Sequence, residues 1–351
     1  MRFKDITIRV PENLLQEVSN MVVKHGQTVD SFTTMAWMAY LLESTESQTG
    51  KAIPRINTTA HDAPVFEKIR SDSIDFGSIQ HIATQEFDFE GHLWGQFHRY
   101  LPIKFTLRHL ALLLQDADAP YVSVSAWYEH VKARANDAWK ELRALDKKFM
   151  KSRGEQLASG FPNPNKDGKE DKERKEKGLS RFLRHFCVDG TDLDKPAGMP
   201  AELGLITLQA DERGQPEVGL TQAGLDFVML ENPIFDAEPY GDALSGPEIA
   251  FLIAHTTSNL SDDLTLMVDL LTWVDKLGLT SATALDEQME QCYGESTKWK
   301  YNTATCSTYK GGVMGRLSEM KLLSRRWQNR RAIYSVSAAG RAFLEETEMM
   351  K

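Results

Sequence analysis

The chain has 351 residues, of which 41% are hydrophobic and 26% charged, a balance typical of globular proteins with two or three domains. No apolar run approaches the roughly 18 residues needed to span a bilayer, and the polar N-terminus lacks the apolar core of a signal peptide, so we expect a cytoplasmic protein. The net charge of −9 excludes a protein that is basic over its whole surface.

Residues 4–44 predict a strand, a helix, a turn and a second helix. Apolar and polar residues alternate before Pro11, which stops a strand and suits a helix start. The apolar set is Ile6, Ile8 and Val10, and the polar set is Asp5, Thr7 and Arg9. Leu14, Leu15 and Val18 then recur at helical spacing, Gly26 ends that helix, and Thr28 can cap the next. A lone strand has two unpaired edges, so a second copy of the chain is its simplest partner.

Over about 40 residues this pattern resembles the ribbon-helix-helix repressors of the Arc/CopG type. The resemblance implies a homodimer, formed through residues 1–48, whose paired strands enter the major groove of double-stranded DNA. The readers of base edges would be Asp5, Thr7 and Arg9, and Thr28 and Val29 would hold a phosphate. Asp5 and Asp30 are acidic where a repressor meets DNA, so the motif serves either DNA reading or dimerisation alone.

The middle of the chain gives weaker patterns. Residues 49–100 predict an irregular connector, and two long helical patterns follow around 105–115 and 123–150. Residues 162–178 contain no apolar side chain and predict a mobile loop. We interpret residues 101–235 as a winged-helix-like module that contacts proteins, because its predicted hairpin tip, Asp211-Glu212-Arg213, is acidic.

An internal repeat links this module to the C-terminus. The spacing from Glu202 to Gly224 is 22 positions and that from Glu319 to Gly340 is 21, and each copy predicts a helix end, a hairpin and another helix. Thr221 and Ser337 are natural N-caps for the second helix of each copy.

Residues 245–347 form the second predicted module. Helices are expected at Asp262–Leu277, Ala282–Cys292 and Ser307–Met320. The third helix has a face of small residues, Thr308, Gly311, Gly315 and Ser318. Glycine costs a helix about 1 kcal/mol, so either close approach to a DNA backbone or tight packing should offset it.

Positive charge concentrates in this module. Residues 295–341 carry ten Lys/Arg and two Asp/Glu, a net of +8, so the rest of the chain carries −17. The combination of this third helix with the cationic hairpin that follows it resembles the corresponding part of the winged-helix regulators of the MarR and ArsR groups. The resemblance implies DNA contact, and a solvated basic face is the alternative. The DNA-binding residues in this module would be Lys310, Arg316, Arg325, Arg326, Arg330 and Arg331.

No motif of catalysis or cofactor binding occurs. The chain lacks GxGxxG, GxxxxGK[ST], GxSxG and HExxH, and its nine histidines match no common metal pattern. We therefore expect no catalytic residue, metal or cofactor, although an enzyme with a site assembled from distant residues stays open.

The sequence thus predicts a mainly α fold with short β-strands, made of a ribbon-helix-helix part and two winged-helix-like modules. The expected function is sequence-specific DNA binding by a homodimeric transcriptional or partition-type regulator. The alternative is a structural or adaptor subunit of a larger DNA-processing or defence complex, which would bind other protein subunits.

Overall fold

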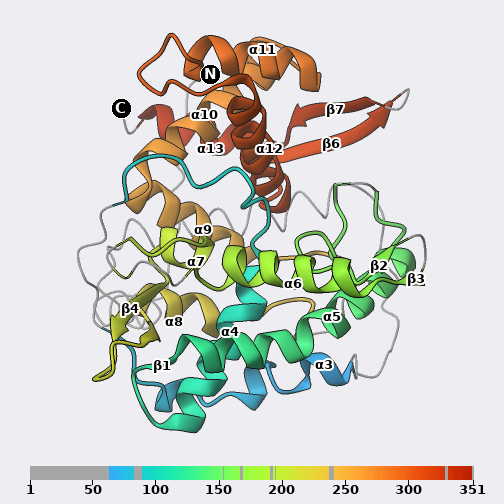
Figure 1. The fold of residues 1–351 in the computed structure, drawn as a ribbon. Coiled ribbons are helices and arrows are strands. Elements are labelled where there is room, and N and C mark those ends of the chain that lie inside the picture. Colours follow the sequence, from blue (N-terminus) through green and yellow to red (C-terminus); the bar gives the residue numbers. More distant parts are fainter. Residues whose placement is uncertain are drawn as a thin grey trace, which may run out of the picture.

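The computed structural model describes residues 63–349 apart from 83–88, 153, 167–168, 190–192, 194, 237–240 and 329–330. The predicted ribbon-helix-helix part, with Thr7, Arg9 and Thr28, lies outside the described residues, as does Arg330 of the C-terminal hairpin. The described part is mainly helical, with small antiparallel sheets (Figure 1). None of its helices is long and apolar enough to cross a membrane.

The first unit follows three short helical turns and is built around a three-stranded sheet in the order β1-β5-β4. The turns are α3 (Pro64–Glu67), η1 (Ser71–Ser73) and η2 (Phe76–Ser78). The unit runs α4 (Leu101–Ala117), β1 (Val122–Ser123), α5 (Val124–Lys148), β2 (Asn165–Lys166), β3 (Lys169–Glu170), α6 (Lys172–Phe186), α7 (Met199–Glu202), β4 (Ile206–Ala210), β5 (Pro216–Leu220) and α8 (Gln222–Met229). Val122 of β1 faces Val218 of β5, and Ile206 of β4 faces Leu220.

The second unit repeats the main part of this order, without counterparts of β2, β3 and α7. After α9 (Gly246–Asn259) come α10 (Ser261–Asp275), α11 (Ala282–Tyr293), α12 (Thr303–Glu319), β6 (Leu323–Gln328), β7 (Arg331–Val336) and α13 (Ala338–Met349). Ser281, between α10 and α11, forms an antiparallel bridge with Ile333 of β7 and so takes the place of β1. Helix α12 packs on α10 and α11, as α6 packs on α4 and α5.

The internal repeat is confirmed at the level of atoms. Thr221 Oγ1 accepts a hydrogen bond from the Gly224 N–H at 3.0 Å, and Ser337 Oγ accepts one from Gly340 at 2.9 Å. A Cβ on Gly224 would lie 1.9 Å from the carbonyl oxygen of Leu205, and one on Gly340 would lie 2.1 Å from that of Leu322. Both glycines therefore let the second helix of each copy press against the turn before its hairpin.

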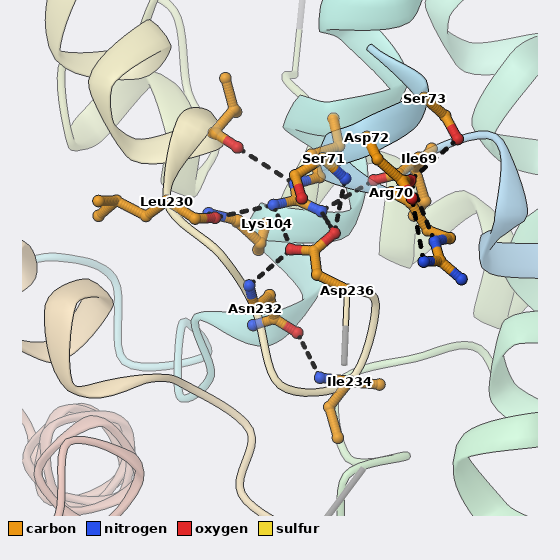
Figure 2. A network of polar contacts seen from close by, with 12 residues as sticks. Ile69, Arg70, Ser71, Asp72, Ser73, Lys104, Leu230, Asn232, Ile234 and Asp236 are labelled. Carbon is orange, nitrogen blue, oxygen red and sulfur yellow. Dashed lines mark hydrogen bonds and ion pairs between the residues drawn. The ribbon is translucent and has the colours of Figure 1, made fainter. Parts of the chain in front are cut away.

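Helix α4 is buried on nearly every side and carries two buried cations, Lys104 and Arg108. Figure 2 shows the network of polar contacts around Asp236. The Arg108 guanidinium binds both Asp236 oxygens, at 2.6 and 2.7 Å, and also donates to backbone carbonyls of Ile69, Val228 and Leu230. Lys104 pairs with Glu248 at 3.0 Å, and burial lowers its pKa to about 8. These pairs tie α4 to η1 and to the residues that lead into the second unit.

Residues 89–100 form a strap between the two units, where an irregular connector was expected. Leu93 N–H donates to Asp263 of α10 at 3.2 Å, and Trp94 N–H donates to Glu202 of α7 at 3.2 Å. Tyr100 N–H donates to Glu319 of α12. Glu202 and Glu319 are equivalent positions of the repeat, so each unit holds the strap through the same glutamate.

The prediction of a mobile loop at 162–178 is wrong for most of its length. Strands β2 and β3 pair there, and α6 begins at Lys172. The Asp171 side chain caps α6 by accepting from Arg174 N–H at 2.8 Å, and Glu173 pairs with Lys177 at 2.5 Å. Buried Leu179, Phe182, Leu183 and Phe186 anchor the second half of the helix. Because that apolar half packs on the core, it holds the charged half in a helix too.

Candidate nucleic-acid interface

The hairpin of β6 and β7 divides its arginines between two faces. Side chains alternate along each strand, and the register pairs Arg326 with Ile333 and Gln328 with Arg331. Arg326 and Arg331 are therefore diagonal neighbours on one face, roughly 7–8 Å apart. Both are exposed, and neither has a carboxylate partner among the described residues. Arg325 lies on the opposite face, so the predicted arginine cluster is two sites rather than one.

Arg325 is half-buried between the hairpin and the rest of the protein. Its guanidinium lies over the rings of Trp327 and Tyr334, at 4.9 and 5.8 Å from their centroids. It also covers Gly154, where a Cβ would lie 2.1 Å from its Nη1 atom. The Nε atom is buried and has no hydrogen-bond partner. A buried donor of this kind costs free energy until an acceptor reaches it.

Arg316 does not serve as a DNA contact in this structure, contrary to the sequence-based prediction. It is completely buried, and its guanidinium binds both Asp263 oxygens at 2.6 and 2.8 Å. It also donates to the carbonyl of Phe97 in the strap at 2.7 Å. Helical spacing alone could not show that the basic residue at this position faces the protein core.

Lys310 is a second correction. Its side chain is 10% exposed and forms an ion pair of 2.6 Å with Asp286 of α11. It also donates to the carbonyl of Ala282 at 3.1 Å. The lysine therefore stabilises the packing of α11 on α12 and offers little charge to a ligand.

The small residues of α12 are explained mainly by packing on the strap. A Cβ on Gly312 would lie 2.4 Å from the carbonyl oxygen of Gly95, and one on Gly315 would lie 2.7 Å from that of His98. Of the two explanations that the sequence left open, tight packing holds for Gly315 of the predicted face, and it also explains Gly312, which lies outside that face. Gly311 differs, because nothing lies within 4 Å of its Cβ position.

Gly311 faces a hollow of about 600 Å³, which we name the α12 hollow. It lies between α12, the inner face of the hairpin and residues 154–159, and none of the described residues that line it is a carboxylate. Its polar and basic side chains include His98, Arg99, Gln156, Ser159, Ser307, Thr308, Lys310, Ser318 and Arg325. Arg99 is committed to Glu319 and Lys310 to Asp286, which leaves Arg325 to face the space. The arrangement can accept an anion.

The sequence-based prediction of the site missed two groups of residues. His92 of the strap is buried among Tyr293, Trp299, Tyr301 and Tyr309, with 2.9 Å between its Nδ1 atom and the Tyr301 hydroxyl. No local sequence pattern predicts this contact, because its partners lie some two hundred residues further along the chain. The second group, on α6, had a signal: Arg174, Lys177 and Arg181 stand at helical spacing after a capping aspartate.

Among the described residues, no three or more His, Cys, Asp or Glu side chains are grouped to hold a metal ion. Comparison with protein-family models, with curated proteins and with solved structures finds no match.

Proposed function

We propose that the protein binds double-stranded DNA through its C-terminal unit, in the manner of a winged-helix protein. The order of α10, the bridge at Ser281, α11, α12, β6 and β7 is that of a winged helix, with the hairpin as the wing. The α6-containing unit has the same order with β2, β3 and α7 inserted, which supports two winged-helix-like modules. The expectation of homodimerisation and of base reading by the N-terminal residues stays part of the proposal.

One observation carries the proposal: the described part of the chain supplies no carboxylate partner to the exposed cations of the wing. Arg326 and Arg331 lie exposed on one face of the hairpin, and Arg325 faces the α12 hollow from the other. The buried cations Arg316 and Lys310 of the same unit each have a carboxylate. The arginines of the wing repel one another, and a bound polyanion relieves this repulsion. DNA is such a polyanion because of its phosphates.

Within this proposal, the C-terminal unit contacts phosphates. Gly312 and Gly315 hold the middle of α12 against the strap, so only its first turns are exposed, through Thr303, Ser307 and Gly311. These side chains are short and uncharged and give few hydrogen bonds to base edges. Base reading would therefore fall to Thr7 and Arg9 of the predicted ribbon.

The test is the salt dependence of DNA binding by the double variant R326Q/R331Q. Each lost phosphate contact lowers the slope of log affinity against log salt by about 0.9, so we expect a slope shallower by about 1.8. The control is R70Q/R213Q, which removes two arginines that line neither the α12 hollow nor the wing. Wild-type slope in a folded R326Q/R331Q protein would show that the wing does not touch DNA.

A regulator and an adaptor differ in sequence preference. Selection of bound duplexes from a random pool should enrich one motif if the protein is a regulator. An adaptor subunit binds phosphates alone and should enrich none. Enrichment that survives R326Q/R331Q but not R9A would place base reading in the N-terminal part.

A further inference from the structure

Helix α6 holds the place in the first unit that α12 holds in the second. It packs on α4 and α5 as α12 packs on α10 and α11. After a break, the short α7 completes the position next to β4. In a winged-helix arrangement this is the helix next to the nucleic acid. The two units differ in charge: the second has a basic hairpin and a neutral exposed helix face, whereas the first has an acidic hairpin tip.

Helix α6 of the first unit is basic, with six Lys/Arg and two Glu. Arg174, Lys177 and Arg181 follow one helix face with spacings of three and four residues and are all exposed. Lys177 pairs with Glu173 at 2.5 Å, whereas Arg174 and Arg181 have no carboxylate partner among the described residues. The seven helical steps from Arg174 to Arg181 cover about 10 Å of helix.

These cations border a hollow of about 740 Å³, which we name the α6 hollow. Its base includes Phe161, Phe182 and the buried His185. The pKa of His185 is lowered to about 4 by burial and by the positive charges of Arg184 and Arg181. Two carboxylates line it, and both are engaged. Asp171 caps the helix, and Glu173 binds Lys177.

The α6 hollow adjoins the interface described above, because His98 lines both the α6 hollow and the α12 hollow. Arg99, Ser318 and Arg325 line both the α12 hollow and a third hollow of about 520 Å³ that reaches Arg326. Glu155, Asp242 and Glu319 also line this third hollow, where Asp242 pairs with Lys321 and Glu319 with Arg99. The three adjoining hollows form a groove from the basic face of α6 to the wing. Figure 1 shows the wing and the β2–β3 end of α6 on the same side of the molecule.

We infer that this groove binds the sugar-phosphate backbone of the duplex held by the wing, with Arg174 and Arg181 of α6 as its second set of phosphate contacts. The inference rests on the proposed function. Each unit supplies what the other lacks: the second unit gives the wing, and the first gives the basic helix. The cations stand along a groove at regular spacing, which suits the repeating charge of a backbone better than a single acidic group.

The experiment measures binding of a fluorescent 30-base-pair duplex of mixed sequence over a salt series. The full-length R174Q/R181Q variant should bind with a slope shallower by about 1.8 than the wild type. R70Q/R213Q, which removes the same charge from residues outside the groove, should keep the wild-type slope. The R174Q/R181Q/R326Q/R331Q variant should lose about 3.6 in slope, because the two contact sets are separate. Unchanged melting temperatures establish that the variants are folded.

A second readout does not depend on affinity. Phosphate beside Arg181 offsets the positive charge around His185, so the His185 pKa of the wild type should rise when the duplex is added. In R174Q/R181Q the pKa of the free protein is already raised by the loss of Arg181, and the duplex should not change it further. NMR titration of the imidazole carbons measures it.

The outcomes separate the two proposals. If R174Q/R181Q keeps the wild-type salt slope while R326Q/R331Q has a shallower one, the α6 contact is overturned and the wing proposal stands. The reverse pattern would keep α6 and overturn the wing. Polyglutamate that competes as well as DNA of equal charge, and only through Arg174 and Arg181, would overturn the DNA backbone in favour of an acidic protein partner.

Discussion

A charged side chain in a protein interior is stable only when an oppositely charged group is buried beside it. Arg316 of α12 is an example. Its guanidinium binds Asp263 of α10 and the carbonyl of Phe97 in the strap. Three segments therefore meet at one side chain. The strap adds the N–H of Leu93 to the same carboxylate, so the charge of Asp263 is shared between a cation and a backbone donor.

We expect Arg316→Met to lower the free energy of unfolding by about 3–5 kcal/mol, because it leaves Asp263 buried without its cation. Urea denaturation measures the change. The matched control is Arg326→Met on the exposed face of the wing, for which we expect a change within about 0.5 kcal/mol. A loss below 1 kcal/mol for Arg316→Met would contradict the buried pair.

At the scale of the element, α12 contains two adjacent glycines with opposite surroundings. Gly312→Ala would bring a Cβ to 2.4 Å from the Gly95 carbonyl oxygen, so the helix and the strap must separate. We expect a loss of about 1–3 kcal/mol. Gly311→Ala meets nothing within 4 Å and should stabilise by up to about 1 kcal/mol through helix propensity. Thermal melts of the two variants should move in opposite directions, and equal shifts would refute the packing.

The elements that the sequence predicted well are those whose signals are local. Apolar periodicity and caps predicted helices at Asp262–Leu277 and Ala282–Cys292, and α10 and α11 begin within one residue of these starts. The repeat was visible because Thr221 and Ser337 act within a single turn. The strap could not be predicted, because its partners, such as Glu202 for Trp94, lie more than a hundred residues away.

Most of the errors in the predicted site have the same cause. Arg316 and Lys310 were chosen for charge and position on a helix, but their carboxylates come from α10 and α11, which only the fold brings near. The charged half of α6 was assigned to a loop from composition. Its cap and its Glu173–Lys177 pair were local signals that favoured a helix.

At the scale of the whole molecule, the strap connects the two repeated units and fixes their relative position. Glu202 and Glu319 hold opposite ends of the same strap, so the groove between α6, α12 and the wing has a fixed geometry. A single chain then presents only a few phosphate contacts, which is a weak basis for binding at physiological salt. A second copy of the chain on the same duplex would multiply the contacts.

The last prediction therefore concerns assembly. The alternating strand at residues 5–10 lies outside the described residues, and its pattern predicts pairing with a second copy. Ile8→Pro removes an N–H from that ladder and should convert a dimer of 39.6 kDa chains into monomers in light scattering. Thr7→Ala keeps the N–H and should stay dimeric. Loss of the second copy removes the gain of bivalent binding, roughly 10²–10⁴ in affinity, on a long duplex, whereas a duplex that holds one C-terminal unit should bind almost unchanged. An Ile8→Pro protein that remains fully dimeric would place the dimer contact elsewhere in the chain.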